Sequence, residues 1–149
     1  MKGQPRIFVE WNYHEKIAFK HFEHANDLAE ALFVDGTHGM RAMSAIRSIT
    51  HTAKAQLDWF AMRGFFLQGR PPVWIIRQEQ FDADWATFCN KIGVPASPVP
   101  SSDPERQHRN DYADVPALSR RARRNLERWY CQDIEFYRRC CLWIEKHND

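Results

Sequence analysis

The sequence predicts a helix-dominated α/β fold with one buried strand and a long C-terminal helix. Apolar residues recur every three or four positions over several stretches, which indicates amphipathic helices. Residues 73–76 (Val73, Trp74, Ile75 and Ile76) form a short, β-favouring apolar run, typical of a strand covered on both faces. The chain has 149 residues, of which 44% are hydrophobic, so we expect one globular domain over residues 1–149.

The first half of the chain reads as successive helices. Residues 13–22 carry apolar side chains at helical spacing, and Asn26 is a suitable N-cap for a second helix. After turn residues at 35–39, the spacing of Met43, Ile46 and the apolar residues beyond them predicts a long helix over about 40–60. A short helix follows at about 65–68, and the prolines at 71–72 end it.

After the strand, a helix is expected over 82–92, with Asp82 as its cap and Gly93 at its end. A strand, loop and helix in this order make half of a βαβ unit. Residues 94–117 contain five prolines and no periodicity, which predicts a long loop. Ser119 then caps a last helix that runs to about Lys146.

Composition excludes several classes of function. No apolar run approaches the roughly 20 residues that a transmembrane helix needs, and no basic start precedes an apolar run as in a signal peptide. We therefore expect a cytoplasmic protein with reduced cysteines, since none of the four cysteines forms C-x-x-C. His14, His21 and His24 lie close together, but no second cluster completes a metal site, so no metal is expected.

A basic run is the most unusual feature of the last helix. Its first turns hold four arginines: Arg120, Arg121, Arg123 and Arg124. Cations at a helix start oppose the macrodipole by about 0.3–1 kcal/mol each, which suggests an anionic partner such as a phosphate, a sulfated sugar or a nucleic acid. The favoured alternative is a solvated face, partly neutralised by Glu127 and Asp114, since surface charge runs are common. The net charge of +2 and the lack of a binding motif disfavour nucleic acid.

Two carboxylates also stand out. Glu79 follows the predicted strand, and ligands of open α/β sheets lie beyond the carboxyl ends of strands. The favoured alternative is that Glu79 accepts hydrogen bonds from the backbone or from an arginine and fixes the turn into the next helix. Asp133 falls on the apolar stripe of the last helix, where a charge needs a partner, so a structural ion pair is expected.

Several segments, in this order, resemble bacterial sulfotransferase-family proteins. They are HANDLAEALF (24–33), QLDWF (56–60) and PPVWIIRQEQFDADWATFCNKIGVP (71–95). The loop step His108-Arg109-Asn110 follows them. The closing-helix pattern of the family reads here as Leu118, Ser119, Asn125, Leu126, Trp129, Tyr130, Asp133, Phe136 and Tyr137. The resemblance covers nearly the whole chain, as the C-terminal part of such a protein.

The resemblance implies a P-loop-like α/β fold, 3′-phosphoadenosine 5′-phosphosulfate as sulfuryl donor, and a hydroxyl acceptor, often on a carbohydrate. The family grips its donor with earlier motifs, and this sequence contains neither G-x-x-x-x-G-K-[ST] nor G-x-G-x-x-G. We therefore expect no turnover from the chain alone and assign no catalytic residue. Arg109 and Asn110 carry over as donor-side contacts, and Glu79 carries over as a structural position.

An anion is expected between this loop and the start of the last helix, held by Arg109, Asn110, Arg120 and Arg124. The nucleotide's 3′-phosphate is the first candidate, and a sulfated or hydroxylated sugar acceptor is the next. From another class of function, the alternative is a non-catalytic helical module that binds an anionic partner through the basic loop and helix.

Overall fold

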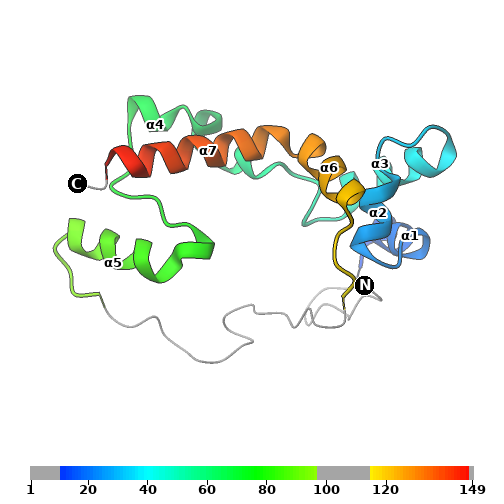
Figure 1. Cartoon of the computed structure of the whole chain (residues 1–149), viewed down its shortest axis with the longest axis horizontal. Coiled ribbons are helices and arrows are strands. Elements are labelled where there is room, and N and C mark those ends of the chain that lie inside the picture. The colour runs from blue at the N-terminus through cyan, green and yellow to red at the C-terminus, as the bar shows by residue number, and fades with distance from the viewer. Residues whose placement is uncertain (1–10, 97–114, 148–149) are drawn as a thin grey trace. The chain divides into compact units, whose positions relative to one another are not determined.

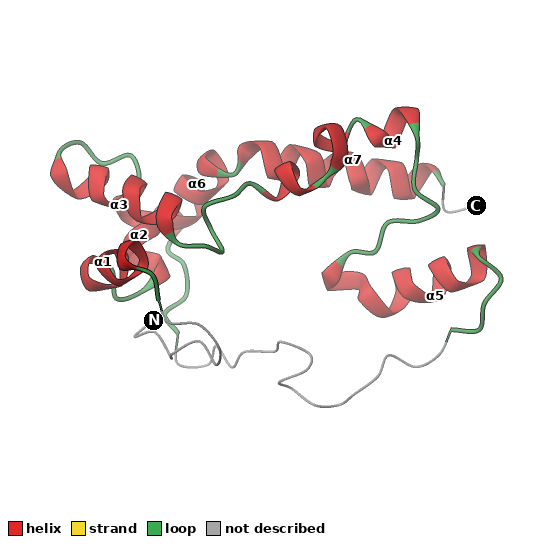
Figure 2. Ribbon diagram, turned by 180° about the vertical axis from the view of Figure 1, so that it is seen from behind, coloured by secondary structure: helices red, strands yellow, loops and turns green. Residues whose placement is uncertain are grey.

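The computed structural model describes residues 11–96 and 115–147, and it is all helical in these two stretches (Figures 1 and 2). The α-helices are α1 (Tyr13–His21), α2 (Ala25–Ala31), α3 (Thr37–Ser48), α4 (Phe66–Gly69), α5 (Phe81–Lys91), α6 (Arg120–Trp129) and α7 (Cys131–Lys146). The 3₁₀ turns are η1 (Gln56–Trp59), η2 (Ala61–Gly64) and η3 (Gln78–Gln80). None of these helices is long and apolar enough to cross a bilayer.

The predicted α/β class is wrong, because residues 73–76 form no strand (Figure 2). Only Trp74 of this run is buried, whereas Val73 is 56% exposed and Ile76 is 37% exposed. A strand exists only as part of a hydrogen-bonded ladder, and the described residues offer this run no partner. High β-propensity reports how well side chains fit a pleated, half-buried surface, and it does not create that surface.

The chain divides into two compact units. The first consists of Met1–Asp58 and Tyr112–Ile134, and the second consists of Trp59–Asp111 and Glu135–Asp149. Among the described residues, the first unit holds α1, α2, α3, α6 and the first residues of α7. The second holds α4, α5 and the remainder of α7. The expectation of one domain over residues 1–149 stays a prediction.

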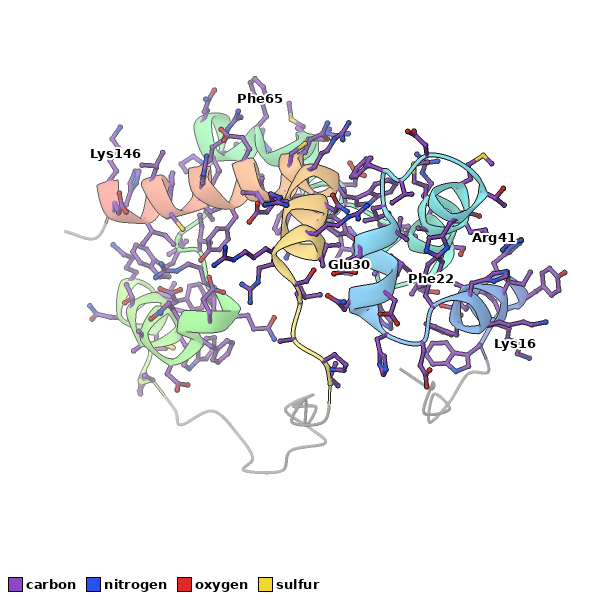
Figure 3. All side chains as sticks on the ribbon, turned by 45° about the vertical axis from the view of Figure 1, so that its right-hand side comes forward. Lys16, Phe22, Glu30, Arg41, Phe65 and Lys146 are labelled. Carbon is purple, nitrogen blue, oxygen red and sulfur yellow. The ribbon has the colours of Figure 1, made fainter. Side chains whose placement is uncertain are left out.

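The core of the first unit forms where α2 packs against α3 and α6, and where α1 packs against α3. Its buried side chains are Ala18, Phe22, Leu28, Ala31, Leu32, Ala42, Ala45 and Ile46. Phe22 lies at the end of α1 (Figure 3). Gly39 permits the close approach of α3 to the preceding turn, because a Cβ there would overlap the carbonyl group of Val34.

A buried carboxylate explains where α3 ends. Glu15 is 1% exposed, and one of its oxygens accepts the Asn12 amide in a capping box at the start of α1. Its other oxygen accepts the Thr50 amide at 3.0 Å and the Thr50 hydroxyl at 2.7 Å. The Thr52 hydroxyl donates to the Ile46 carbonyl at 2.6 Å. The Thr50 amide and the Ile46 carbonyl would pair in a continuing helix, so the predicted helix over 40–60 stops at Ser48.

The predicted C-terminal helix is interrupted. Ser119 is its N-cap, as expected, and its hydroxyl oxygen accepts the Ala122 amide at 3.1 Å. At Tyr130 the backbone departs from helical geometry (φ −99°, ψ 27°), and α6 and α7 meet there at a turn (Figure 1). The Tyr130 hydroxyl donates to the Thr52 carbonyl at 3.1 Å. The single long helix of the prediction is therefore two helices.

The second unit is built on aromatic contacts. The Phe60 and Phe136 rings lie 4.8 Å apart between centroids, and Trp74 meets Trp143 at 6.0 Å. At the end of α5, the Gly93 amide (φ +70°) donates to the Asn90 carbonyl at 3.1 Å. The Val94 amide donates to the Cys89 carbonyl at 3.0 Å. This pattern is a Schellman motif, so the predicted end of the helix at Gly93 is confirmed.

Candidate anion-binding site

The start of α6 is fixed to α2 by polar side chains. The Ser119 amide donates to the Asn26 side chain at 2.8 Å, and the Ser119 hydroxyl donates to the Glu30 carboxylate. Glu30 lies on α2 beside the start of α6 (Figure 3). Six residues later, the Asn125 amide group donates to the Ala29 carbonyl at 2.9 Å and to two other carbonyls near the end of α2. These bonds define which face of α6 is inward.

Glu30 also changes the electrostatics of the helix start. A carboxylate beside an N-terminus interacts favourably with the positive end of the macrodipole. Since the Ser119 oxygen already accepts the Ala122 amide, protein groups satisfy much of this terminus. A further anion at this end would therefore be held mainly by arginine side chains.

The arginine run lies on the outward face of α6. All four of its residues are exposed, whereas Ala122 is 0% exposed on the opposite face. The Arg123 Nε donates to the Leu118 carbonyl at 3.4 Å. Arg120, Arg121 and Arg124 form no ion pair with any described residue. Arg120 and Arg124 are one turn apart and repel each other, so an anion held between them would relieve that repulsion.

The neutralising groups expected from the sequence are not supplied by the described chain. Glu127 is exposed and pairs with no described cation. Asp114 lies outside the described residues, as do Arg109 and Asn110 of the predicted site. The structure therefore places Arg120 and Arg124 on one exposed helix face, while the contribution of the loop stays a prediction.

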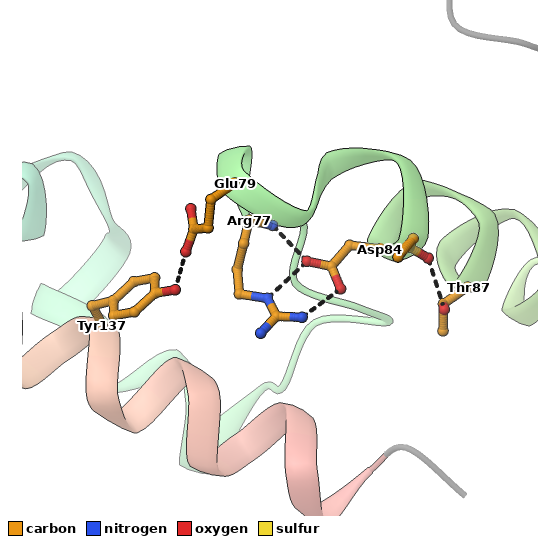
Figure 4. Close-up of polar contacts among 6 residues, drawn as sticks. Arg77, Glu79, Asp84, Thr87 and Tyr137 are labelled. Atoms are coloured by element: carbon orange, nitrogen blue, oxygen red, sulfur yellow. Dashed lines mark hydrogen bonds and ion pairs between the residues drawn. The ribbon is translucent and has the colours of Figure 1, made fainter.

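Glu79 lies in the second unit, in η3, where the Tyr137 hydroxyl donates to its carboxylate (Figure 4). The neighbouring Arg77 binds Asp84 through two side-chain bonds of 2.8 and 2.9 Å, and its backbone amide donates to the same carboxylate at 2.9 Å. The hydrogen bond from the guanidinium group lowers the pKa of Asp84 below its ordinary value. Glu79 thus accepts a hydrogen bond from α7 within this unit, and its role as a structural position of the family stays a prediction.

Asp133 belongs to the first unit and caps η1. Its two oxygens accept the Gln56 amide at 3.0 Å and the Leu57 amide at 2.9 Å. The described residues place no cation against it. The expectation of an ion pair was therefore wrong about the partner, because two backbone amides satisfy the carboxylate instead.

The residues that carry the family resemblance make contacts within each unit. Asn125 binds carbonyls of the segment 24–33, and Asp133 binds amides at the start of the segment 56–60. Tyr137 binds Glu79 of the segment 71–95. The contacts of Asn125 were not predicted from its position in the sequence. A signal was present, because an amide side chain beside Ala122 and Leu126 on an apolar stripe needs hydrogen-bond partners.

The described residues contain no group of three or more histidine, cysteine, aspartate or glutamate side chains that could hold a metal ion. No family model matches the chain, and no curated protein or solved structure matches it either.

Proposed function

We propose that this chain is a helical module that binds an anionic partner through the exposed guanidinium groups of α6. The observation that carries the proposal is that Arg120, Arg121 and Arg124 are exposed and unpaired within the described residues. Glu30 compensates the helix terminus without pairing with any of them. These three guanidinium groups of α6 therefore have no carboxylate partner in the described part of the chain.

Phosphate and sulfate groups are the ligands that suit such a face. A guanidinium group binds these oxyanions with two parallel hydrogen bonds, which gives both strength and geometry. Arg120 and Arg124 lie about 6 Å apart along the helix axis, given a rise of about 1.5 Å per residue. The 3′-phosphate of an adenosine nucleotide is the first candidate ligand, and a sulfated sugar is the second, as the family resemblance suggests.

The experiment is a calorimetric titration with 3′,5′-adenosine bisphosphate and with heparin fragments, at low and high salt. Arg120→Ala/Arg124→Ala should weaken binding at least about tenfold, since charge-assisted hydrogen bonds contribute about 1.5–3 kcal/mol each. Arg109→Ala, measured separately, tests the contribution of the loop. The matched control is Arg41→Ala/Arg138→Ala, which removes the same charge from exposed arginines elsewhere.

Two results would contradict the proposal. If the wild-type chain binds neither ligand at low salt, the arginines form only a solvated face. If the control variant loses as much affinity as the α6 variant, the attraction comes from net charge. Equal binding of both ligands that collapses in salt would identify a nonspecific polyanion patch and exclude a nucleotide site.

Sulfuryl transfer is the second candidate function. It rests on the order of the resembling segments in the sequence, since the described residues do not form the α/β fold that the resemblance implied. We expect no sulfuryl transfer by this chain alone, since its 149 residues include no glycine-rich phosphate-binding loop. Incubation with labelled 3′-phosphoadenosine 5′-phosphosulfate and a panel of sugars and phenols should give no labelled ester, and a clear product would refute this restriction.

A further inference from the structure

A second surface of the first unit combines an arginine and polar side chains with two methionines. It is a depression open to solvent, with a volume of about 580 Å³. It is lined by His14, Met40, Met43, Ser44, Arg47 and Ser48. Ligand pockets in proteins commonly measure about 300–1,000 Å³. All of the lining residues except His14 come from α3, so the depression is separate from the arginine face of α6.

This surface lies on the face of α3 that the core does not use. Ala42, Ala45 and Ile46 are buried on the opposite side of the helix. Met40 and Arg47, two turns apart, share the outer face, and Met40 is 59% exposed. Packing in the described core therefore does not account for a methionine at this position.

Arg47 is exposed and contacts an aromatic ring. Its guanidinium carbon lies 5.2 Å from the centroid of the Trp129 ring, so the ring contacts the planar group. The Trp129 ring in turn meets Phe33 at 6.0 Å. Arg47 forms no ion pair with a described residue. Because Arg47 is exposed and a guanidinium group presents its N–H donors as a planar fork, Arg47 can bind a carboxylate through two of them.

The neighbouring side chains complete a site with a polar end and an apolar floor. The Ser44 hydroxyl has no hydrogen-bond partner in the described chain, and it lies one turn from Arg47. The Ser48 hydroxyl donates to the Ala45 carbonyl at 3.0 Å and keeps its capacity to accept. Met40 and Met43 offer flexible, polarisable apolar surface that adapts to a chain.

We propose that this depression binds an amphipathic anion, namely a carboxylate attached to an unbranched apolar chain. The carboxylate pairs with the in-plane donors of Arg47 and accepts from Ser44, while the chain lies across Met40 and Met43. A bare anion lacks the apolar contact, and a neutral chain lacks the partner for Arg47. The site therefore requires both parts of the ligand.

The test is a titration of the full chain, uniformly labelled with ¹⁵N, using decanoate below its micelle concentration and following amide chemical shifts. We expect shifts concentrated on residues 40–48 and around His14. Acetate supplies the anion alone and 1-decanol supplies the chain alone, and each should bind at least about tenfold more weakly than decanoate. Shifts confined to other residues, or equal affinity for decanoate and 1-decanol, would overturn the proposal.

Variants separate this site from general charge. Arg47→Gln should weaken decanoate binding about tenfold or more. Arg41→Gln, which removes an exposed arginine of the same helix outside the lining, should leave the affinity unchanged (Figure 3). Arg120→Ala/Arg124→Ala should also leave it unchanged, so this proposal and that for α6 fail independently. An Arg41→Gln loss equal to that of Arg47→Gln would overturn the site.

Arg47 also contacts Trp129, so its loss could disturb the fold. Met40→Ser provides the second variant, since Met40 is mostly exposed and its replacement leaves the core intact. It should preserve the amide spectrum of the free chain and weaken decanoate binding severalfold, with little effect on acetate. Unchanged decanoate affinity in Met40→Ser would overturn the assignment of the apolar floor.

Discussion

At the scale of single residues, this chain joins distant segments through polar side chains that bind backbone groups. Glu15 binds the amide of Thr50, and Asn125 binds carbonyls at the end of α2. Such bonds satisfy helix ends that would otherwise be left without partners. Removing one partner leaves the other unsatisfied, which costs more than the bond itself contributes.

Asn125 gives the clearest test of this arrangement. Asn125→Ala should lower the free energy of unfolding by about 1–2 kcal/mol, because three carbonyl contacts lose their donor. Asn125→Asp should cost more, since a carboxylate would face those carbonyls. Urea denaturation measures both. The exposed neighbour Arg124→Ala is the control and should change stability by less than about 0.5 kcal/mol. Equal effects at both positions would contradict this account.

The Arg77–Asp84 pair predicts a defined pH dependence. Binding by Arg77 lowers the pKa of Asp84 below its ordinary value of 3.8, so the pair stabilises the fold fully above that value. Its contribution is lost as the pH falls through the lowered pKa. The difference in unfolding free energy between wild type and Asp84→Asn should therefore be constant from about pH 5 to 7 and shrink below about pH 4.

Denaturation at a series of pH values measures that difference. Glu135→Gln is the control, because Glu135 forms an exposed pair with Arg139 at 3.2 Å, and such pairs contribute only about 0.3–0.5 kcal/mol. A difference between wild type and Asp84→Asn that does not shrink in acid would show that Asp84 acts through its shape and not through its charge.

At the scale of elements, helix positions followed from local signals more closely than helix lengths did. The helix expected at 82–92 is α5 (Phe81–Lys91), but Asp82 lies in its first turn and is not its cap, which is Gln80. Ser119 caps α6 as predicted. The helix over 40–60 was too long because Glu15 and Thr52 take the groups that would extend it, and their positions depend on tertiary structure. The prediction of a strand at 73–76 was wrong for a related reason. A strand needs a second strand to pair with, and a local sequence pattern does not show whether one is present.

Gly93 tests the Schellman end of α5. Gly93→Ala should destabilise the second unit by about 1 kcal/mol, because the left-handed backbone (φ +70°) disfavours a side chain although space for a Cβ is open. Gly69→Ala, at the end of α4, is the matched control: its surroundings are equally open, and its φ is not positive. Thermal unfolding of the two variants should differ, and equal melting temperatures would refute the backbone explanation.

At the scale of the whole molecule, apolar burial is uneven. The core cluster lies entirely within the first unit. The second unit leaves large side chains such as Phe65 and Leu142 exposed at 62% and 64%, respectively. Because burial of apolar surface is the dominant favourable contribution to stability, the two units should open with different free energies.

Native-state hydrogen exchange can measure this difference. Amides of α3 in the first unit should be better protected than amides of α5 in the second, with exchange of α5 requiring a smaller free energy of opening. Leu142→Ser, at an exposed position, should leave both protection levels nearly unchanged. Equal opening free energies for α3 and α5 would show that the two units unfold as one.

The candidate sites differ in how far sequence could reveal them. The arginine run is contiguous, so its exposure on one end of α6 could be anticipated from helical periodicity. The depression at Arg47 could not, because it brings His14 of α1 beside α3, and that neighbourhood arises only through the packing of the first unit. The roles of Glu30 and Asn125 required the pairing of α2 with α6 in the same way.

The capping of η1 by Asp133 has a consequence for the order of events during synthesis on the ribosome. The Leu57 amide depends on a carboxylate 76 residues further along the chain. At about 5–20 residues per second, translation supplies that carboxylate about 4–15 s after Leu57 has been added. Throughout that interval the nascent chain can form α1 to α3 from its own residues, while η1 is uncapped. The first unit can therefore be completed only after Asp133 has been added to the chain.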